Sequence, residues 1–145
     1  LHEDATCTTT WRIDQHYPDP RNADKYPGEE WMSIGVLTPI DFYPLPYRCF
    51  YSKDIPNMFM AGRNISVTHI ALGSTRVMRT CGLIGEVVGM AASICVKKKV
   101  APRDIYTTYF EDLKELIRKG TGRTDVPYTQ FYHQVDRTGH QAEDR

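Results

Sequence analysis

Two polar side chains near the start of the chain have the types and the spacing for acid–base chemistry. Asp14 and His16 lie two residues apart in a segment that reads as a strand. Alternate side chains of a strand face the same side, so a carboxylate and an imidazole can meet there. Such a pair can hold and move a proton near neutral pH. A pair that only anchors the surface or a loop is the alternative.

A second candidate for chemistry is the run Gly73-Ser74-Thr75-Arg76, at the expected start of a long helix that runs to Val96. The first turn of a helix leaves backbone N–H groups unpaired at the positive end of its dipole. These groups suit an anion or an electron-rich carbonyl, such as the pyrimidine edge of a flavin. Every helix has such an end, so this feature alone does not identify a ligand.

Small residues recur inside the same helix, at Gly82, Gly85, Gly89 and Ala92. This spacing places them in one stripe that is nearly free of side chains. Each interior glycine costs roughly 1 kcal/mol relative to alanine, so three of them need a physical reason. Close approach of another backbone or of a flat ligand is such a reason. We expect the stripe to pack onto a strand.

Several short strands are expected to position these residues. Pro44 and Pro46 exclude a helix and favour an extended edge segment. The run at 58–62 is apolar without alternation, which suits a strand covered on both faces. Composition predicts strands over 5–14, 31–37, 47–51 and 58–62.

A shorter helix is expected over 108–119, after a loop at 101–106. Thr108 and Glu111 have the spacing of a capping box, and Gly120 is the expected stop. The predicted fold class is therefore α+β. A small sheet packs against the long glycine-striped helix, and the shorter C-terminal helix lies outside.

Charge and cysteine content limit the classes of partner. The 145 residues include 18 basic and 18 acidic side chains, so no net field attracts nucleic acid. The four cysteines show no C-x-x-C spacing, so neither a metal site nor a thioredoxin-like motif is expected. The sequence does not decide whether Cys7 and Cys49 form a disulfide. Because the chain starts without methionine, in a segment that reads like the middle of a longer sequence, we expect a C-terminal fragment of a longer polypeptide.

A long pattern in the second half resembles a known family. The segment IPNMFMAGRNISVTHIALGSTRVMRTCGLIGEVVGMAASICVKKKVAPRDI is similar to the C-terminal signature of FAD-dependent oxidoreductases of the glutathione-reductase-like flavoprotein superfamily. The closer group is a bacterial family, some of whose members carry the label xanthan lyase. TWRIDQHYPDP and PLPYRCFYSKDI also resemble that family, and together the segments cover roughly residues 6–120.

The resemblance implies an FAD cofactor and places contacts for it. The backbone from Gly73 to Val77, with Ser74, Thr75 and Arg76, would lie against the flavin pyrimidine and stabilise charge on the reduced ring. Gly62 would let the backbone approach the cofactor. Many relatives follow this glycine with an acidic residue that binds the ribityl chain. This sequence has Arg63 and Asn64 instead, so Asn64 is a candidate substitute.

The resemblance also implies a substrate side. Asp14 and His16 would then work near the flavin, and His69 would lie near its ring or make a structural hydrogen bond. Arg76 would contact an anion or the flavin, with a buried salt bridge as the alternative. An aromatic cluster would line a pocket for a sugar-like substrate or, as we expect, form core; it contains Tyr43, Tyr47, Phe50 and Tyr51.

No G-x-G-x-x-G loop for the ADP half of FAD occurs in the sequence. We therefore expect tight FAD binding to need the N-terminal remainder of the same polypeptide, and the isolated chain to be inactive and prone to self-association. The expected division is a substrate-side part (1–56), the closing part of an FAD domain (57–120) and a polar tail (121–145). A non-catalytic binding domain and a polysaccharide lyase, with Tyr47, Arg48 or His16 in its site, are the alternatives.

Overall fold

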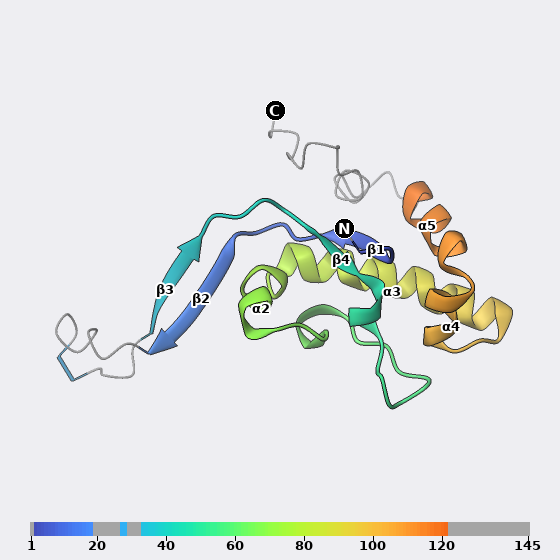
Figure 1. The fold of residues 1–145 in the computed structure, drawn as a ribbon, viewed down its shortest axis with the longest axis horizontal. Coiled ribbons are helices and arrows are strands. Elements are labelled where there is room, and N and C mark those ends of the chain that lie inside the picture. Colours follow the sequence, from blue (N-terminus) through green and yellow to red (C-terminus); the bar gives the residue numbers. More distant parts are fainter. Residues whose placement is uncertain (1, 19–26, 29–32, 122–145) are drawn as a thin grey trace.

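The computed structural model describes residues 2–18, 27–28 and 33–121, and Figure 1 shows their arrangement. In chain order the elements are β1 (Ala5–Thr8), β2 (Ile13–Pro18), β3 (Ser33–Thr38), β4 (Pro44–Pro46), the 3-10 helices η1 (Tyr47–Phe50) and η2 (Gly62–Asn64), and the helices α2 (His69–Thr75), α3 (Met78–Lys98), α4 (Pro102–Thr107) and α5 (Phe110–Lys119). The predicted α+β class, with a long helix and a shorter C-terminal one, is confirmed.

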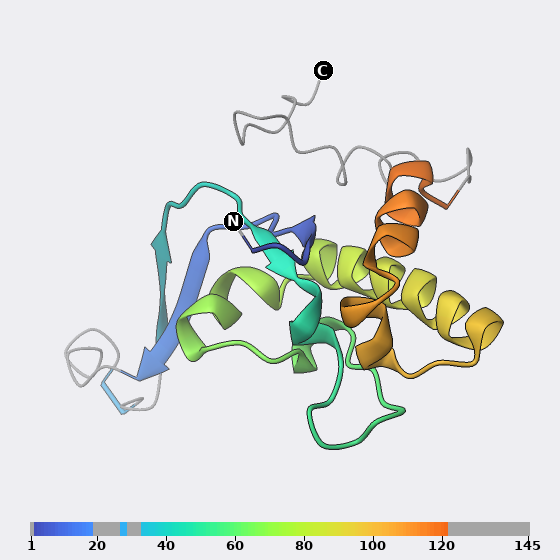
Figure 2. The same cartoon turned by 45° about the vertical axis from the view of Figure 1, so that its right-hand side comes forward.

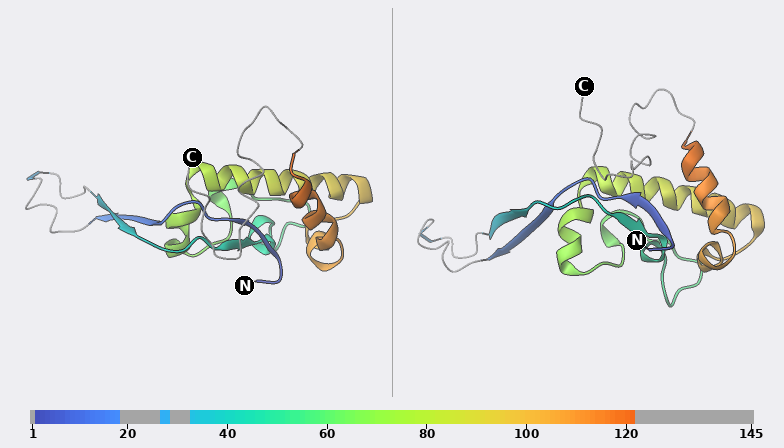
Figure 3. Two further views of the ribbon diagram at one scale, coloured as in Figure 1. Left: turned by 90° about the horizontal axis from the view of Figure 1, so that it is seen from above. Right: turned by 45° about the horizontal axis from the view of Figure 1, so that its top comes forward.

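The described strands form two separate antiparallel pairs rather than one sheet. The predicted strand 5–14 is interrupted: β1 pairs with the edge segment β4, and β2 pairs with β3 in register from Ile13 opposite Thr38 to Pro18 opposite Ser33. The β2–β3 ribbon extends along the long axis of the molecule, away from α3 (Figure 3). The first two residues of the predicted strand 31–37 and most of the predicted tail 121–145 lie outside the described residues.

The core lies along one side of α3. Leu83, Ile84, Val87, Ala91 and Ile94 are buried there at the helical spacing. Complete burial of an aliphatic side chain of this size contributes about 1.5–3 kcal/mol. α4 and α5 pack against the C-terminal part of α3 (Figure 2). α3 is also long and apolar enough to span a membrane, a property that core helices of soluble proteins share.

Two predicted strands are wrong. Residues 47–50 form the 3-10 helix η1, because Tyr47 and Phe50 both reach the core when the chain turns with a period of three. The segment 58–62 forms only an isolated bridge between Phe59 and Tyr51. Among the described residues no strand lies beside it to extend that pairing. The aromatic cluster is core, as expected: the Tyr47 ring contacts the rings of Phe50, Tyr51 and Phe110.

The predicted helix boundaries also change. The loop expected at 101–106 is mostly α4, which starts with Pro102 and is capped where the Asp104 carboxylate accepts from the Ala101 N–H at 2.8 Å. The Thr108–Glu111 capping box is wrong, because Thr108 ends α4 by donating its N–H to the Asp104 carbonyl. Tyr109 is the N-cap of α5. Gly120 ends that helix as expected, with a φ of 64°.

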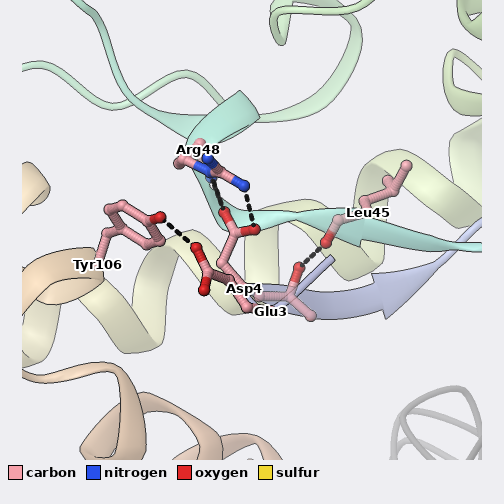
Figure 4. A network of polar contacts seen from close by, with 6 residues as sticks. Glu3, Asp4, Leu45, Arg48 and Tyr106 are labelled. Carbon is pink, nitrogen blue, oxygen red and sulfur yellow. Dashed lines mark hydrogen bonds and ion pairs between the residues drawn. The ribbon is translucent and has the colours of Figure 1, made fainter. Parts of the chain in front are cut away.

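An ionic network fastens β1 to the rest of the fold (Figure 4). The buried Asp4 carboxylate accepts from the Arg48 backbone N–H, Nε and Nη2 at 2.9–3.0 Å. Burial raises the pKa of Asp4, but these hydrogen bonds outweigh it and leave that pKa below its usual value. The Tyr106 hydroxyl donates to Glu3 at 2.6 Å, and the Arg48 guanidinium lies over the Tyr106 ring. β1, η1 and α4 are therefore held together through charged groups.

No strand among the described residues packs on the glycine stripe, so that prediction is wrong. Gly82 and Gly89 are exposed, and a Cβ added at Gly82, Gly85 or Gly89 would meet nothing within 4 Å. At the two ends of the same face, the Met78 and Val96 side chains are 92% and 79% exposed. We call this row, with Met78, Gly82, Gly85, Gly89, Ala92 and Val96, the glycine face of α3.

Candidate functional site

An open cleft of about 600 Å³ lies at the start of α3. The segment after β1, the segment after β3 and the first turn of α3 meet there. Trp11 and Phe42 supply aromatic surface, and the Arg12 guanidinium lies 5.8 Å from the centre of the Trp11 ring. The residues that line the cleft are Thr10, Trp11, Arg12, Pro39, Ile40, Phe42, Val77, Met78 and Arg79. A volume of this size suits a small molecule or the ring system of a cofactor.

The N-terminus of the long helix lies in this cleft, and not where the sequence predicted it. Gly73, Ser74 and Thr75 belong to α2, and α3 begins only at Met78, after Arg76 and Val77. Val77 is the N-cap and offers no side-chain acceptor, although valine is among the poorest residues for that position. The first intrahelical bond runs from the Cys81 N–H to the Val77 carbonyl. The amide of Met78, the first helical residue, therefore has no partner within the helix.

A buried hydroxyl network holds this helix start against β1. The Thr80 hydroxyl accepts from the Thr10 N–H at 3.0 Å and lies 2.8 Å from the Thr10 hydroxyl. The Ser74 hydroxyl lies 2.8 Å from the Tyr43 hydroxyl, and the Tyr43 N–H donates to Thr9 Oγ1. Because these groups are buried and paired, they fix the walls of the cleft. The threonine run 8–10 was the available sequence signal, but it indicated only a strand.

α2 approaches β2 through a glycine. A Cβ at Gly73 would lie 2.9 Å from the Asp14 carbonyl oxygen and 3.0 Å from its nitrogen. Gly73 therefore allows helix and strand backbones to touch, and it does not open a helix N-terminus. Ser74 and Thr75 are buried, and Thr75 Oγ1 has no hydrogen-bond partner among the described residues. Figure 2 shows α2 beside the β2–β3 ribbon.

Asp14 and His16 meet, as the sequence predicted. His16 Nε2 lies 2.9 Å from Asp14 Oδ1. The other carboxylate oxygen, Oδ2, lies 3.2 Å from Arg76 Nη2, which also donates to the Asp14 carbonyl at 3.2 Å. Arg76 therefore makes a partly buried ion pair. Since Arg12 and Val77 line the cleft, Asp14 and Arg76 each lie one or two residues along the chain from a cleft wall.

The other predicted cofactor contacts lie outside the lining of this cleft. His69 is the exposed first residue of α2. Gly62 adopts a φ of 83° in η2 and packs against the Cys81 side chain, and Arg63 and Asn64 beside it are exposed. These residues lie along the first turns of α3, on the side of Cys81 rather than in the cleft.

Tyr47 and the cysteines are poor candidates for chemistry. Tyr47 is fully buried, its hydroxyl donates to the Pro102 carbonyl, and burial raises its pKa. It therefore cannot serve as a solvent-accessible base. All four cysteines are free, so the disulfide left open between Cys7 and Cys49 does not form. Burial raises the pKa of the Cys7 thiol to about 12.

Sequence reasoning missed the cleft walls. Trp11, Phe42 and Met78 come from three distant parts of the chain, and none was among the predicted site residues. The useful signal was weak: a hydrophobic residue, Val77, where a capping side chain is expected before a long helix. Amides at a helix start without a side-chain cap need another hydrogen-bond acceptor, such as a ligand.

The comparisons give one family. Residues 1–117 match the family model described as FAD dependent oxidoreductase. No curated protein and no solved structure matches the chain. The matched range contains the cleft, the start of α3 and the Asp14–His16 pair. This chain belongs to the FAD dependent oxidoreductase family.

Proposed function

We propose that this chain forms the flavin-ring end of the FAD site in an FAD-dependent oxidoreductase, together with part of the substrate side. One observation carries the proposal: the long helix α3 starts without a side-chain cap, and its first residues line a cleft with aromatic walls. Family membership supports FAD as the cofactor. We further propose that the whole protein has the architecture of the glutathione-reductase-like flavoproteins. We also propose that its nearer relatives include proteins labelled xanthan lyase.

The donor set of the cleft fits the ring end of FAD. Backbone N–H groups in the first turn of α3 can donate to an electron-rich carbonyl edge, at the positive end of the helix dipole. Trp11 and Phe42 offer flat apolar surface for a conjugated ring. The sequence offers no matching site for the ADP half of FAD, because the sequence contains no G-x-G-x-x-G loop.

Each candidate residue then has a role. FAD, when bound, supplies two-electron redox chemistry. The Met78 amide, in the first turn of α3, would stabilise negative charge on the edge of the ring that it faces, as donors do in an oxyanion hole. Trp11 and Phe42 exclude water. His16, oriented by Asp14, accepts a proton from a small-molecule or sugar-like substrate and holds it.

The earlier candidates keep more limited roles in this proposal. Gly73, Ser74 and Thr75 set the position of the cleft by packing and hydrogen bonding, because all three are buried. Gly62, with Arg63 and Asn64, is proposed to contact the cofactor beyond its ring. His69 is proposed only as an outer contact, since it lies at the exposed start of α2.

The open glycine face is an argument that another polypeptide segment packs on this chain. A Cβ added at any of the three glycines of this face would meet no described atom within 4 Å, and a second backbone can approach a helix closely where side chains are absent. We propose that the N-terminal remainder of the same polypeptide covers this face and supplies the ADP site. The purified chain is then expected to carry no stoichiometric flavin absorbance and to self-associate. A compact monomer in sedimentation that retains FAD through purification contradicts both expectations.

Substitution of Val77 tests the flavin-ring proposal. Val77→Asp places a carboxylate acceptor at the N-cap, so it should stabilise the chain by about 0.5–2 kcal/mol. The same carboxylate competes for the amides and repels an electron-rich carbonyl. We therefore expect affinity for riboflavin, which has the ring without ADP, to fall about tenfold, the equivalent of about 1.4 kcal/mol. Quenching of riboflavin fluorescence and urea unfolding measure the two effects.

Val77→Asn is the matched control for charge, because it caps the helix without a negative charge. It should stabilise the chain and weaken riboflavin binding less than the aspartate does. Trp11→Ala should weaken riboflavin binding without a gain in the stability of the chain. Riboflavin binding that is unchanged in Val77→Asp and in Trp11→Ala would exclude the cleft as the site of the flavin ring.

A further inference from the structure

The Asp14 carboxylate is shared between two partners on opposite oxygens. Arg76 Nη2 lies 3.2 Å from Oδ2, and His16 Nε2 lies 2.9 Å from Oδ1. Arg76 also donates to the Asp14 carbonyl, and the Gly73 backbone lies directly against Asp14. The carboxylate is thus fixed from the α2 side, and one oxygen is left to orient the imidazole.

The imidazole reaches Asp14 because the residue opposite it on β3 has no side chain. His16 is paired in register with Gly35. A Cβ at Gly35 would lie 2.9 Å from His16 Cε1, 3.3 Å from His16 Nε2 and 3.4 Å from Asp14 Oδ1. The Cε1–Nε2 edge of the ring therefore occupies the space that any other residue at position 35 would fill.

The second ring nitrogen is available for chemistry. A carboxylate accepts hydrogen bonds only, so an Nε2 that donates to Asp14 carries the proton and leaves Nδ1 with its lone pair. Nδ1 makes no hydrogen bond to any described residue, and the His16 side chain is 48% exposed. A proton taken up at Nδ1 gives an imidazolium, and the donor is left as its conjugate base.

We infer that Gly35 and Asp14 are positioning residues that hold the His16 imidazole with its Nε2–H toward Asp14 and with Nδ1 outward as the proton acceptor. The inference deepens the proposed function, because it names the base of that site and the residue that makes room for it. Gly35 acts through His16 and does not itself touch the substrate. Its backbone has no left-handed φ, so the absent side chain is its only special property.

Nuclear magnetic resonance of the full ¹⁵N-labelled chain, without flavin, tests the inference. At about pH 8 a free imidazole is neutral and its N–H exchanges rapidly with water. We expect a detectable N–H signal on Nε2 of His16, assigned by its loss in His16→Gln. In Gly35→Ala the signal should disappear or exchange about tenfold faster, since a hydrogen bond to a charged group is lost.

Val36→Ala is the control, because this exposed residue lies on the same strand and points to the opposite face. It should leave the His16 signal unchanged. The inference is overturned if the native chain shows no Nε2–H signal for His16, or if Gly35→Ala leaves that signal and its exchange rate as they were. Riboflavin binding is measured on the same samples. In the native chain, absence of the Nε2–H signal with intact riboflavin binding rejects the inference alone, and absent riboflavin binding with an intact signal rejects the proposed function alone.

Discussion

The two sides of α3 differ in what covers them. One side packs against β1, η2, α4 and α5 and buries residues such as Ile84 and Val87. The other side is the glycine face, where a Cβ added at any of the three glycines would meet no atom of the described residues within 4 Å. Gly73, a few residues earlier in α2, makes the contrast sharper, because a Cβ there would collide with the Asp14 backbone. A glycine in a helix therefore indicates close packing only when the residue that it faces is known.

Alkaline pH should produce the largest effect, on the covered side. The Cys7 thiol is buried in β1, next to α3, and burial raises its pKa from an ordinary 9.0 to about 12. The folded state therefore keeps a proton that the unfolded chain loses. The protonated Cys7 thiol therefore makes its full contribution to the free energy of unfolding below pH 9.0. That free energy then falls by about 1.4 kcal/mol per pH unit as the pH rises from 9.0 towards 12.

Urea unfolding at a series of pH values measures this loss, and Cys7→Ala is the control. Burial raises the pKa of Tyr47 as well, so part of the pH dependence should remain in Cys7→Ala. The difference in slope between the two proteins belongs to Cys7. Equal slopes between pH 9 and 12 would mean that the Cys7 thiol reaches solvent while the protein is folded.

Gly73→Ala should have the next largest effect. The new methyl group meets backbone atoms, which cannot rotate away, so α2 and β2 must separate. Overpacking of this kind costs about 1–3 kcal/mol. The expected result is a lower urea midpoint and a weakened Arg76–Asp14 pair. A stability equal to that of the native chain would show that α2 moves freely on β2.

Alanine on the glycine face should have the smallest effect, with the opposite sign. Gly85→Ala and Gly89→Ala should each stabilise the isolated chain by about 0.5–1 kcal/mol, because alanine is the better helix former and nothing obstructs its methyl group. The same substitutions should impair association with the proposed remainder of the polypeptide. Thermal unfolding measures the first effect, and sedimentation of a mixture measures the second. A loss of stability in the isolated chain contradicts an open glycine face.

Local patterns predicted much of the fold. The strand at 33–37, the edge segment at Pro44, the body of α3 and the stop at Gly120 followed from composition, proline chemistry or helical spacing. Most of β2 did not, because the predicted strand ended at residue 14 and β2 runs from Ile13 to Pro18. The break between α2 and α3 did not, since Arg76 and Val77 include neither glycine nor proline. Thr68 caps α2 through the Ala71 N–H, a signal that lay earlier than the helix start expected from composition.

The candidate site was harder to predict than the fold. The Asp14–His16 pair was predictable because its two members are neighbours on one strand. Its dependence on Gly35 was not, since that requires the register of a second strand. The roles of Gly73 and of the glycine stripe were reversed: the first was assigned to an open helix end and the second to a packed face. Sequence spacing shows which residues share a face, but only the tertiary fold shows what lies opposite.

The fastening of the N-terminal segment has a consequence for synthesis of the protein. Thr6 bonds Leu45, Asp4 bonds Arg48, Thr10 bonds Thr80 and Glu3 bonds Tyr106, at sequence separations of 39, 44, 70 and 103 residues. A ribosome releases the chain from its N-terminus, so β1 emerges long before most of its partners. Such non-local contacts form late and slow the folding rate. Thr10 therefore waits for α3 and Glu3 for α4, and a truncation that removes α4 leaves Glu3 and the Arg48–Asp4 pair without the support of Tyr106.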